Sequence, residues 1–198
     1  MVGVMFPTYI PGRDPADPQF HPIYAACERH DLPVAFHATV RESIGVARHM
    51  ENFLAVHTCS HSFEQMLSMC STVVGGIPEL FPRLKLGFLE AGCAWVPYWM
   101  ERLDEEWEKR PGDAPHLKRK PSEYIRGGRI FISSEPEEAL LPWVLEHVGE
   151  EIILYASDYP HWDSGYPYTV KTLMERADVT AAQKRKIFYE NPSRFYRL

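Results

Sequence analysis

The sequence predicts an α/β fold built on a parallel sheet, and three observations lead to that prediction. Five short apolar runs recur along the chain, each about the length of one strand. They lack the in-out alternation of a half-exposed strand, which indicates strands covered on both faces. Segments with helical spacing separate the runs, and this alternation is typical of a doubly wound sheet or a barrel. All 198 residues are expected to form one domain.

The predicted strands and helices alternate from one end of the chain to the other. The strands are expected at residues 2–6, 33–37, 84–89, 129–133 and 152–156. The helices are expected at residues 20–30, 61–74, 94–109, 136–148, 168–177 and 180–189. Asp17-Pro18 is a helix-start signal, Gly149 a plausible C-cap, and Asn191-Pro192 an expected stop. Residues 111–121 are expected to form a polar loop.

The first predicted strand is not followed by a glycine-rich phosphate loop. Neither GxGxxG nor GxxxxGK[ST] occurs in the chain. This absence counts against dinucleotide binding and favours the barrel over the doubly wound sheet.

Composition excludes several classes of partner. A net charge of −6 without a strong basic block argues against a nucleic-acid surface. No apolar run reaches the roughly 18 residues that a membrane helix needs, and the first residues do not resemble a signal peptide. The four cysteines show no CxxC spacing, which indicates buried thiols in a reducing compartment. We therefore expect a cytoplasmic protein that acts on a small molecule and binds neither nucleic acid nor membrane.

Polar side chains follow the predicted strands where each strand ends. His37, Glu90 and Asp158 close three of them, and His161 lies three residues beyond Asp158. In a parallel barrel the loops at these ends converge on one mouth, where functional residues lie. Imidazole and carboxylate groups together suit a divalent cation. A cation would also compensate an acid that is costly to bury at the end of an apolar strand.

Each of these residues has a simpler interpretation. Asp158 could be a turn residue, and Glu90 could cap the following helix. His37 could donate to a backbone carbonyl at a strand end. His57 and His61, in or beside a helix start, are expected to be structural.

Four ordered motifs resemble the amidohydrolase-related family of metal-dependent hydrolases and decarboxylases, which includes the aminocarboxymuconate-semialdehyde decarboxylase type. They are LPVAFH at 32–37, GGIPELFPRLK at 75–85, LEAGCAWVP at 89–97 and SDYPH at 157–161. The ending YENPSRFY at 189–196 resembles the same family. The resemblance implies part of a TIM (β/α)8 barrel, about strands 4–8, with a divalent metal at its mouth. Zinc is the expected metal, with Mn²⁺ or Fe²⁺ as alternatives.

The resemblance also implies roles for single residues. His37 matches a metal ligand that closes the fifth strand of the family. Asp158 matches the acid that closes the eighth, as ligand or general base. Glu90 departs from the pattern, because decarboxylase members carry a histidine there. This departure counts against decarboxylation and keeps open the hydrolysis or hydration of a carboxylated or lactone-like substrate. Arg102 lies near a position that can face substrate, or forms a surface ion pair. Trp95 is a second substrate-binding candidate, with the core as its alternative.

A second departure concerns the family's first strand, which carries a His-x-His or similar acid-x-His pair; we expect this chain to lack both the motif and the strand that holds it. We therefore expect the C-terminal portion of a longer enzyme, which pairs with its missing half or forms a homo-oligomer to close the barrel. The predicted function is a metal-dependent hydrolase or decarboxylase for a small organic acid or cyclic substrate. His37 and Asp158 would hold the metal, and Asp158, Glu90 and His161 would be catalytic. The activity of the isolated chain is open, and the alternative is a non-catalytic assembly module that keeps the scaffold.

Overall fold

The computed structural model describes residues 1–38 and 50–198. Its centre is a sheet of five parallel strands in the order β1-β2-β3-β4-β5, so that each strand pairs with the next along the chain. The strands are β1 (Val4–Pro7), β2 (Val34–His37), β3 (Leu86–Phe88), β4 (Ile130–Ser134) and β5 (Ile153–Tyr155). All five predicted strands are present, each within two residues of its predicted limits. The predicted α/β fold with a partial barrel is confirmed.

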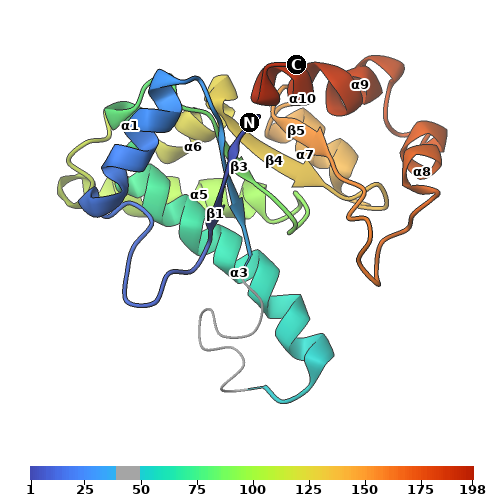
Figure 1. Ribbon diagram of the computed structural model, residues 1–198, viewed down its shortest axis with the longest axis horizontal. Helices are drawn as coiled ribbons and strands as arrows, with labels where there is room; N and C mark the ends of the chain where they lie inside the picture. The colour runs from blue at the N-terminus through green and yellow to red at the C-terminus, as the bar shows by residue number, and fades with distance from the viewer. Residues whose placement is uncertain (39–49) are drawn as a thin grey trace.

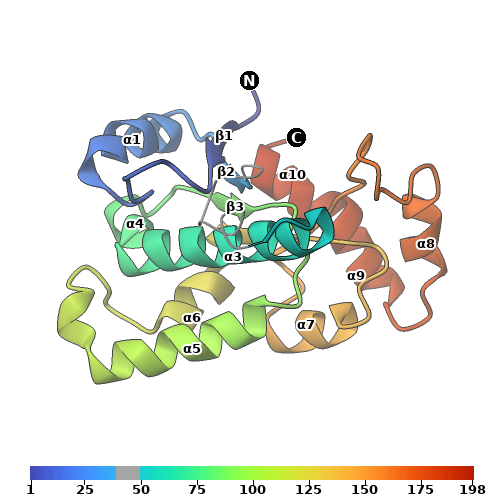
Figure 2. The same cartoon turned by 90° about the horizontal axis from the view of Figure 1, so that it is seen from below.

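Helices connect the strands and follow one another around the sheet (Figures 1 and 2). They are α1 (His21–Arg29), α3 (Phe53–Val74), α4 (Ile77–Leu80), α5 (Val96–Lys109), α6 (Pro121–Tyr124), α7 (Leu141–His147), α8 (Thr169–Glu175), α9 (Ala181–Arg185) and α10 (Asn191–Tyr196). Two single 3-10 turns lie at Pro18–Phe20 and Pro111–Asp113, and two π turns at Ile125–Arg129 and Lys186–Glu190. Within the described ranges, no helix is both long and apolar enough to cross a bilayer.

Three predicted helix boundaries were wrong. The helix expected at 61–74 begins two turns earlier, because the Asn52 side chain accepts from the backbone N–H of Ala55 and caps the first turn. The helix expected at 136–148 begins only at Leu141, because residues 135–138 form a turn that Glu138 fastens to the backbone. Asn191-Pro192 opens α10 instead of stopping a helix, since proline is tolerated in a first turn, where its missing N–H costs no bond.

The two faces of the sheet are packed differently. Alternate strand residues such as Phe36, Phe88 and Ile132 join the main core, with the Phe36 and Phe88 rings stacked at 5.3 Å. On the opposite face, Phe131 contacts Phe195 of α10, with ring centroids 5.0 Å apart. The helix α10 therefore covers part of the face that points away from the main core.

Hydrogen bonds hold α10 at the amino-terminal end of the strands. The Asn191 side chain donates to the carbonyls of Glu150 and Ile153 at 2.8 Å each, beside the start of β5. Lys85, just before β3, donates to the carbonyl of Arg194 at 3.0 Å. The opposite, carboxyl-terminal end of the sheet is thus left for the polar residues that follow the strands.

Candidate metal and active site

Three of the predicted residues come together because each lies at the carboxyl end of a parallel strand of the same sheet. His37 is the last residue of β2, and Glu90 and Asp158 follow shortly after β3 and β5. The Nε2 atom of His37 contacts Oε2 of Glu90, and all three residues line a cavity of about 200 Å³. The imidazole and the two carboxylates thus lie at the same end of the sheet.

Glu90 is the centre of this cluster, because three imidazoles surround its carboxylate. In addition to His37, His61 of α3 places Nε2 at 3.3 Å from Oε1, and His161 places Nδ1 at 3.4 Å from the same oxygen. The backbone N–H of Glu90 donates to Oγ of Ser133 at the end of β4, at 2.8 Å. Side chains from three separate elements therefore fix Glu90.

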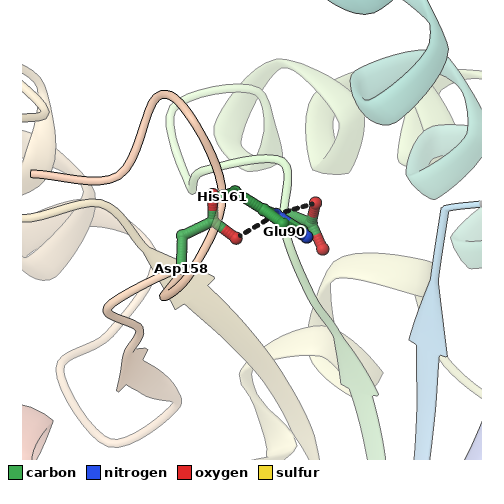
Figure 3. A group of neighbouring side chains, drawn as sticks. All are labelled: Glu90, Asp158 and His161. Carbon is green, nitrogen blue, oxygen red and sulfur yellow. Dashed lines mark ion pairs between the residues drawn. The ribbon is translucent and has the colours of Figure 1, made fainter. Parts of the chain in front are cut away.

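Asp158 is joined to Glu90 through His161, whose Nδ1 lies 2.8 Å from Oδ1 of Asp158 (Figure 3). Both acids have a left-handed backbone, with φ of 61° at Glu90 and 53° at Asp158. This conformation costs a non-glycine residue about 1 kcal/mol or more, and such strain is concentrated at functional sites. The rest of the fold must therefore offset the conformational energy of the two turns that bring these carboxylates together.

The charges of the cluster are mutually dependent. Burial raises the pKa of the Glu90 carboxyl, but the hydrogen bonds from His37 and His61 lower it more, so the net pKa is well below its usual range. The same bonds raise the pKa of both imidazoles, against the opposing effect of burial. Burial and the nearby Glu90 charge raise the pKa of Asp158. Glu90 is thus the ionised member of the acid pair, and Asp158 holds a proton more readily.

The donor set fits a divalent cation. One ligand atom each from Glu90, Asp158 and His161 lies within 4.8 Å of the others. Carboxylate oxygen and imidazole nitrogen match Zn²⁺, Mn²⁺ and Fe²⁺. His37 contacts Glu90 from the other side and lines the same cavity as Asp158. Of the predicted metal pair, Asp158 belongs to this group of three, and His37 lies next to the group through its contact with Glu90.

An open cleft of about 710 Å³ adjoins the cluster and is lined by acids. Six of its lining residues are carboxylates: Glu90, Glu135, Glu137, Glu138, Asp158 and Asp163. Glu138 is engaged in holding the chain after β3, since it accepts from the backbone N–H groups of Cys93 at 2.8 Å and Ala94 at 3.2 Å. Burial, followed by the charge of Asp158, raises the pKa of Glu135 to about 7. A cation would relieve the repulsion among these groups.

The two residues predicted to bind substrate lie elsewhere. Arg102 forms exposed ion pairs on α5 with Glu105 at 3.0 Å and Glu106 at 2.6 Å, and it lines a separate groove. Trp95 is 8% exposed within the main core, and its Nε1 donates to the carbonyl of Gly92 at 2.9 Å. Neither side chain is among the described residues that line the cleft.

His61 is a site residue that sequence reasoning treated as structural. It is 8% exposed, and its ring lies 4.6 Å from that of His57, one turn earlier on α3. The sequence does carry a feature that could have identified His61. Together with Gln65, Ser68 and Thr72 it repeats at helical spacing, which places these polar residues on one face of the helix. A polar stripe on a helix that covers a sheet indicates buried polar contacts.

Comparison with known proteins identifies the family. A family model described as Amidohydrolase matches residues 1–198. The chain belongs to the amidohydrolase family. The predicted family resemblance is thereby confirmed.

Two similar proteins whose names state an activity are decarboxylases. This chain is 26% identical over 160 residues to 2-amino-3-carboxymuconate-6-semialdehyde decarboxylase of Dictyostelium discoideum, covering 80% of the chain and 43% of the relative. The crystal structure of 5-carboxyvanillate decarboxylase LigW from Sphingomonas paucimobilis is 25% identical, with a TM-score of 0.86, over 100% of this chain and 59% of LigW. The chain therefore spans about half the length of these relatives.

A second carboxyvanillate decarboxylase structure shares the fold. It comes from Novosphingobium aromaticivorans, was solved with manganese and 4-hydroxy-3-methoxy-5-nitrobenzoic acid, and is 20% identical with a TM-score of 0.77, over 100% of this chain and 57% of the other.

Proposed function

We propose that this chain carries the metal-dependent catalytic residues of a decarboxylase or hydrolase that acts on a small organic acid. The observation that carries the proposal is the convergence of His37, Glu90 and Asp158 from three strand ends, with His161 bridging the two acids. The named relatives support decarboxylation, since both act on carboxylated compounds by their names. The glutamate at position 90 supports keeping hydrolysis as the second outcome.

The ion would be held by Asp158 and His37, with Glu90 and His161 beside them. When bound, a divalent cation supplies positive charge that polarises a substrate oxygen and offsets the acids of the cleft. Imidazole and carboxylate donors are typical of Zn²⁺, and Mn²⁺ is supported by its presence in a structure of the same fold. Zinc is our first choice, with manganese and iron as the alternatives.

Asp158 is the residue best suited to hold the transferred proton. Its pKa is raised by burial and by the charge of Glu90, so it holds a proton more readily than an ordinary carboxyl group does. For decarboxylation, Asp158 would deliver a proton to the carbon that loses CO₂; for hydrolysis, it would take one from water. His161 at 2.8 Å can pass that proton to or from the solvent side.

Glu90 orients two imidazoles of the site. As the ionised acid, it accepts hydrogen bonds from His37 and His61 and so fixes which nitrogen of each ring carries a proton. The imidazole rings are thereby held with their second nitrogens turned away from Glu90. In His37 the second nitrogen, Nδ1, donates to the backbone carbonyl of Ala38 at 2.9 Å, so an ion would reach this ring at Nε2, in place of the hydrogen bond to Glu90.

We propose a small-molecule substrate and a homo-oligomer, or a second chain that supplies further strands, as the partners. The partner chain is suggested by a sheet whose two outer strands, β1 and β5, each pair with one neighbour among the described residues.

Metal binding is the first test of this function. Protein stripped with a chelator is titrated with Zn²⁺ or Mn²⁺ by calorimetry and melted with and without the ion. At about 100 times the Kd, binding should stabilise the fold by about 2.7 kcal/mol and raise Tm by about 5–10 °C. Asp158→Asn should remove most of this shift. A protein that binds neither ion would favour the non-catalytic assembly module.

Product analysis distinguishes the two reactions. The metal-loaded protein is incubated with a panel of small aromatic and unsaturated carboxylic acids and lactones. Decarboxylation releases CO₂, detected as bicarbonate, whereas lactone hydrolysis releases a proton without CO₂. Release of neither product, in a protein that binds the ion, would contradict both activities for the panel tested.

A further inference from the structure

The inner face of α3 is polar where an apolar surface would be expected. Its buried residues include a row at helical spacing, which we call the α3 polar row: His61, Glu64, Gln65, Ser68 and Thr72. Helices that cover a sheet normally turn an apolar stripe toward it. Buried polar groups are costly unless each finds a partner, so the partners of this row show what it does.

The α3 polar row is bonded to the carboxyl ends of the strands. Ser68 donates to the carbonyl of Thr8, just after β1, at 3.0 Å, and the Thr8 hydroxyl donates to Glu64. His61 contacts Glu90, just after β3. The row thus fastens α3 to the end of the sheet that carries the candidate site.

Gln65 bridges two strand ends with one amide group. Its Nε2 donates to the carbonyl of Phe36 at 3.0 Å and to the carbonyl of Leu89 at 2.5 Å. Phe36 directly precedes His37, and Leu89 directly precedes Glu90. Each bond therefore fixes the peptide group that leads into a site residue.

The geometry determines the orientation of this amide. Two carbonyl acceptors require two N–H donors, which only the NH₂ end of Gln65 supplies. The Gln65 side chain is fully buried, and within the described residues its Oε1 atom has no hydrogen-bond partner. A group that served packing alone would not require a buried oxygen without a partner.

We propose that Gln65 is a positioning residue, which sets the separation of His37 and Glu90 by holding the two peptide groups before them. The inference rests on the proposed metal-dependent function. Without the amide, the carbonyls of Phe36 and Leu89 lose a shared donor, and the His37–Glu90 contact loses its spacing. Because His37 and Glu90 lie at the proposed metal site, removal of the Gln65 amide should lower the affinity of that site for the metal ion.

The test compares Gln65→Met with a matched control, Thr72→Val. Methionine keeps the length and flexibility of glutamine and removes both donors. Thr72 lies two turns further along the same buried row, and its hydroxyl bonds only to carbonyls of its own helix, at 2.7 Å to Ser68 and 3.3 Å to Met69. Both variants remove a buried hydrogen bond on α3, but only Gln65→Met releases strand ends.

Affinity for Mn²⁺ is measured by calorimetry at a temperature where all proteins are folded. Gln65→Met should lose about 10- to 100-fold in affinity, the range seen when a group behind a metal ligand is removed. Thr72→Val should stay within about twofold of the unaltered protein while its Tm falls. Equal affinity of Gln65→Met and the unaltered protein would overturn the proposal and leave Gln65 a packing role. If Gln65→Met does not fold, Gln65→Asn serves, since its shorter amide reaches at most one carbonyl and should lose affinity too.

A structural measurement separates this proposal from the proposed function. Crystal structures of the metal-free unaltered protein and of Gln65→Met would show the contact between His37 Nε2 and Glu90. Loss of the contact only in the variant supports the positioning role even if the unaltered protein binds no Mn²⁺. An intact contact in the variant overturns that role, whether or not metal binds.

Discussion

At the residue scale, the two acids of the site differ in environment and therefore in expected role. Glu90 faces three imidazoles, and the hydrogen bonds from two of them, His37 and His61, outweigh burial and keep it ionised. Asp158 faces one imidazole and the charge of Glu90, which favours its protonated form. A pair of carboxyls with opposite pKa shifts is the usual arrangement for dividing charge stabilisation from proton transfer.

The Asp158→Asn variant tests the proton-transfer role. We expect kcat/KM for a substrate identified in the product screen to fall by about 10²- to 10⁴-fold, because an amide cannot exchange the proton. Asp163→Asn is the control, since Asp163 lines the same cleft and its nearest imidazole, His57, lies 3.9 Å away. Turnover within threefold of the unaltered protein in Asp158→Asn would remove Asp158 from the mechanism.

The raised pKa of Glu135 predicts a pH dependence of stability. Its folded-state pKa of about 7 lies above its unfolded value of about 4.3, so the folded protein binds the extra proton between these values. The stability from this group is fully present below about pH 4 and is lost as pH rises through 7. Glu135→Gln should therefore raise the Tm of chelator-treated protein at pH 8 and change it little at pH 4.

The matched control for this measurement is Glu137→Gln, an exposed acid of the same loop. Its Tm should differ from that of the unaltered protein by a similar small amount at both pH values. A Tm of Glu135→Gln that is no higher than that of the unaltered protein at pH 8 would show that Glu135 is not held protonated.

The residue scale is also where sequence reasoning reached its limit. His37, Glu90, Asp158 and His161 were predicted together because position after an apolar strand is visible in one dimension. His61 was not, because its contact with Glu90 depends on how α3 is rotated about its axis. The contact joins a histidine on a helix to an acid after a strand, and the residue spacing within the helix or within the strand does not predict such a contact.

At the element scale, strand positions were predictable and helix ends were less so. Strands buried on both faces are continuous apolar runs, and each of the five was recognised by that property. The helix ends were less predictable because each depends on one local feature: a capping side chain at α3, a turn fastened by a side chain before α7, and a proline in the first turn of α10. The substrate positions proposed for Arg102 and Trp95 depend on which face of α5 is turned inward, and the structure directs Arg102 to solvent and Trp95 into the core.

The helix α10 provides a stability test at this scale. Phe195 is fully buried against Phe131 and lies close to Gly87, where an added Cβ would come within 2.6 Å of its ring. Phe195→Ala should lower the free energy of unfolding by about 3–5 kcal/mol, because it leaves a cavity on that face of the sheet. Urea denaturation measures the change.

Tyr189→Ala is the control for Phe195→Ala, because Tyr189 precedes α10 and is 62% exposed. Its effect should stay within about 0.5 kcal/mol, as for most surface positions. A loss below about 1 kcal/mol for Phe195→Ala would mean that α10 is not part of the cooperative fold.

At the scale of the whole molecule, the sheet has two outer strands, β1 and β5, and on β5 the carbonyl of Ile153 already accepts a hydrogen bond from the Asn191 side chain. Among the described residues, β1 and β5 each pair with a single neighbour. Met5 in the middle of β1 is 68% exposed on the sheet face that it shares with Ala35, so this outer strand presents an apolar side chain beside its outer edge. Edges of this kind pair with other strands unless they are covered or charged.

We therefore predict that the isolated chain self-associates through β1, and that Met5→Lys weakens the association. A lysine on an edge strand opposes pairing, because its charge would have to be buried against the second chain. Sedimentation velocity over a hundredfold range of concentration should show a shift toward monomer for Met5→Lys. Leu54→Lys is the matched control, since Leu54 is 70% exposed but lies on α3. If the unaltered protein is a monomer at every concentration, the prediction is wrong. If Met5→Lys and Leu54→Lys weaken the association equally, the association does not depend specifically on β1.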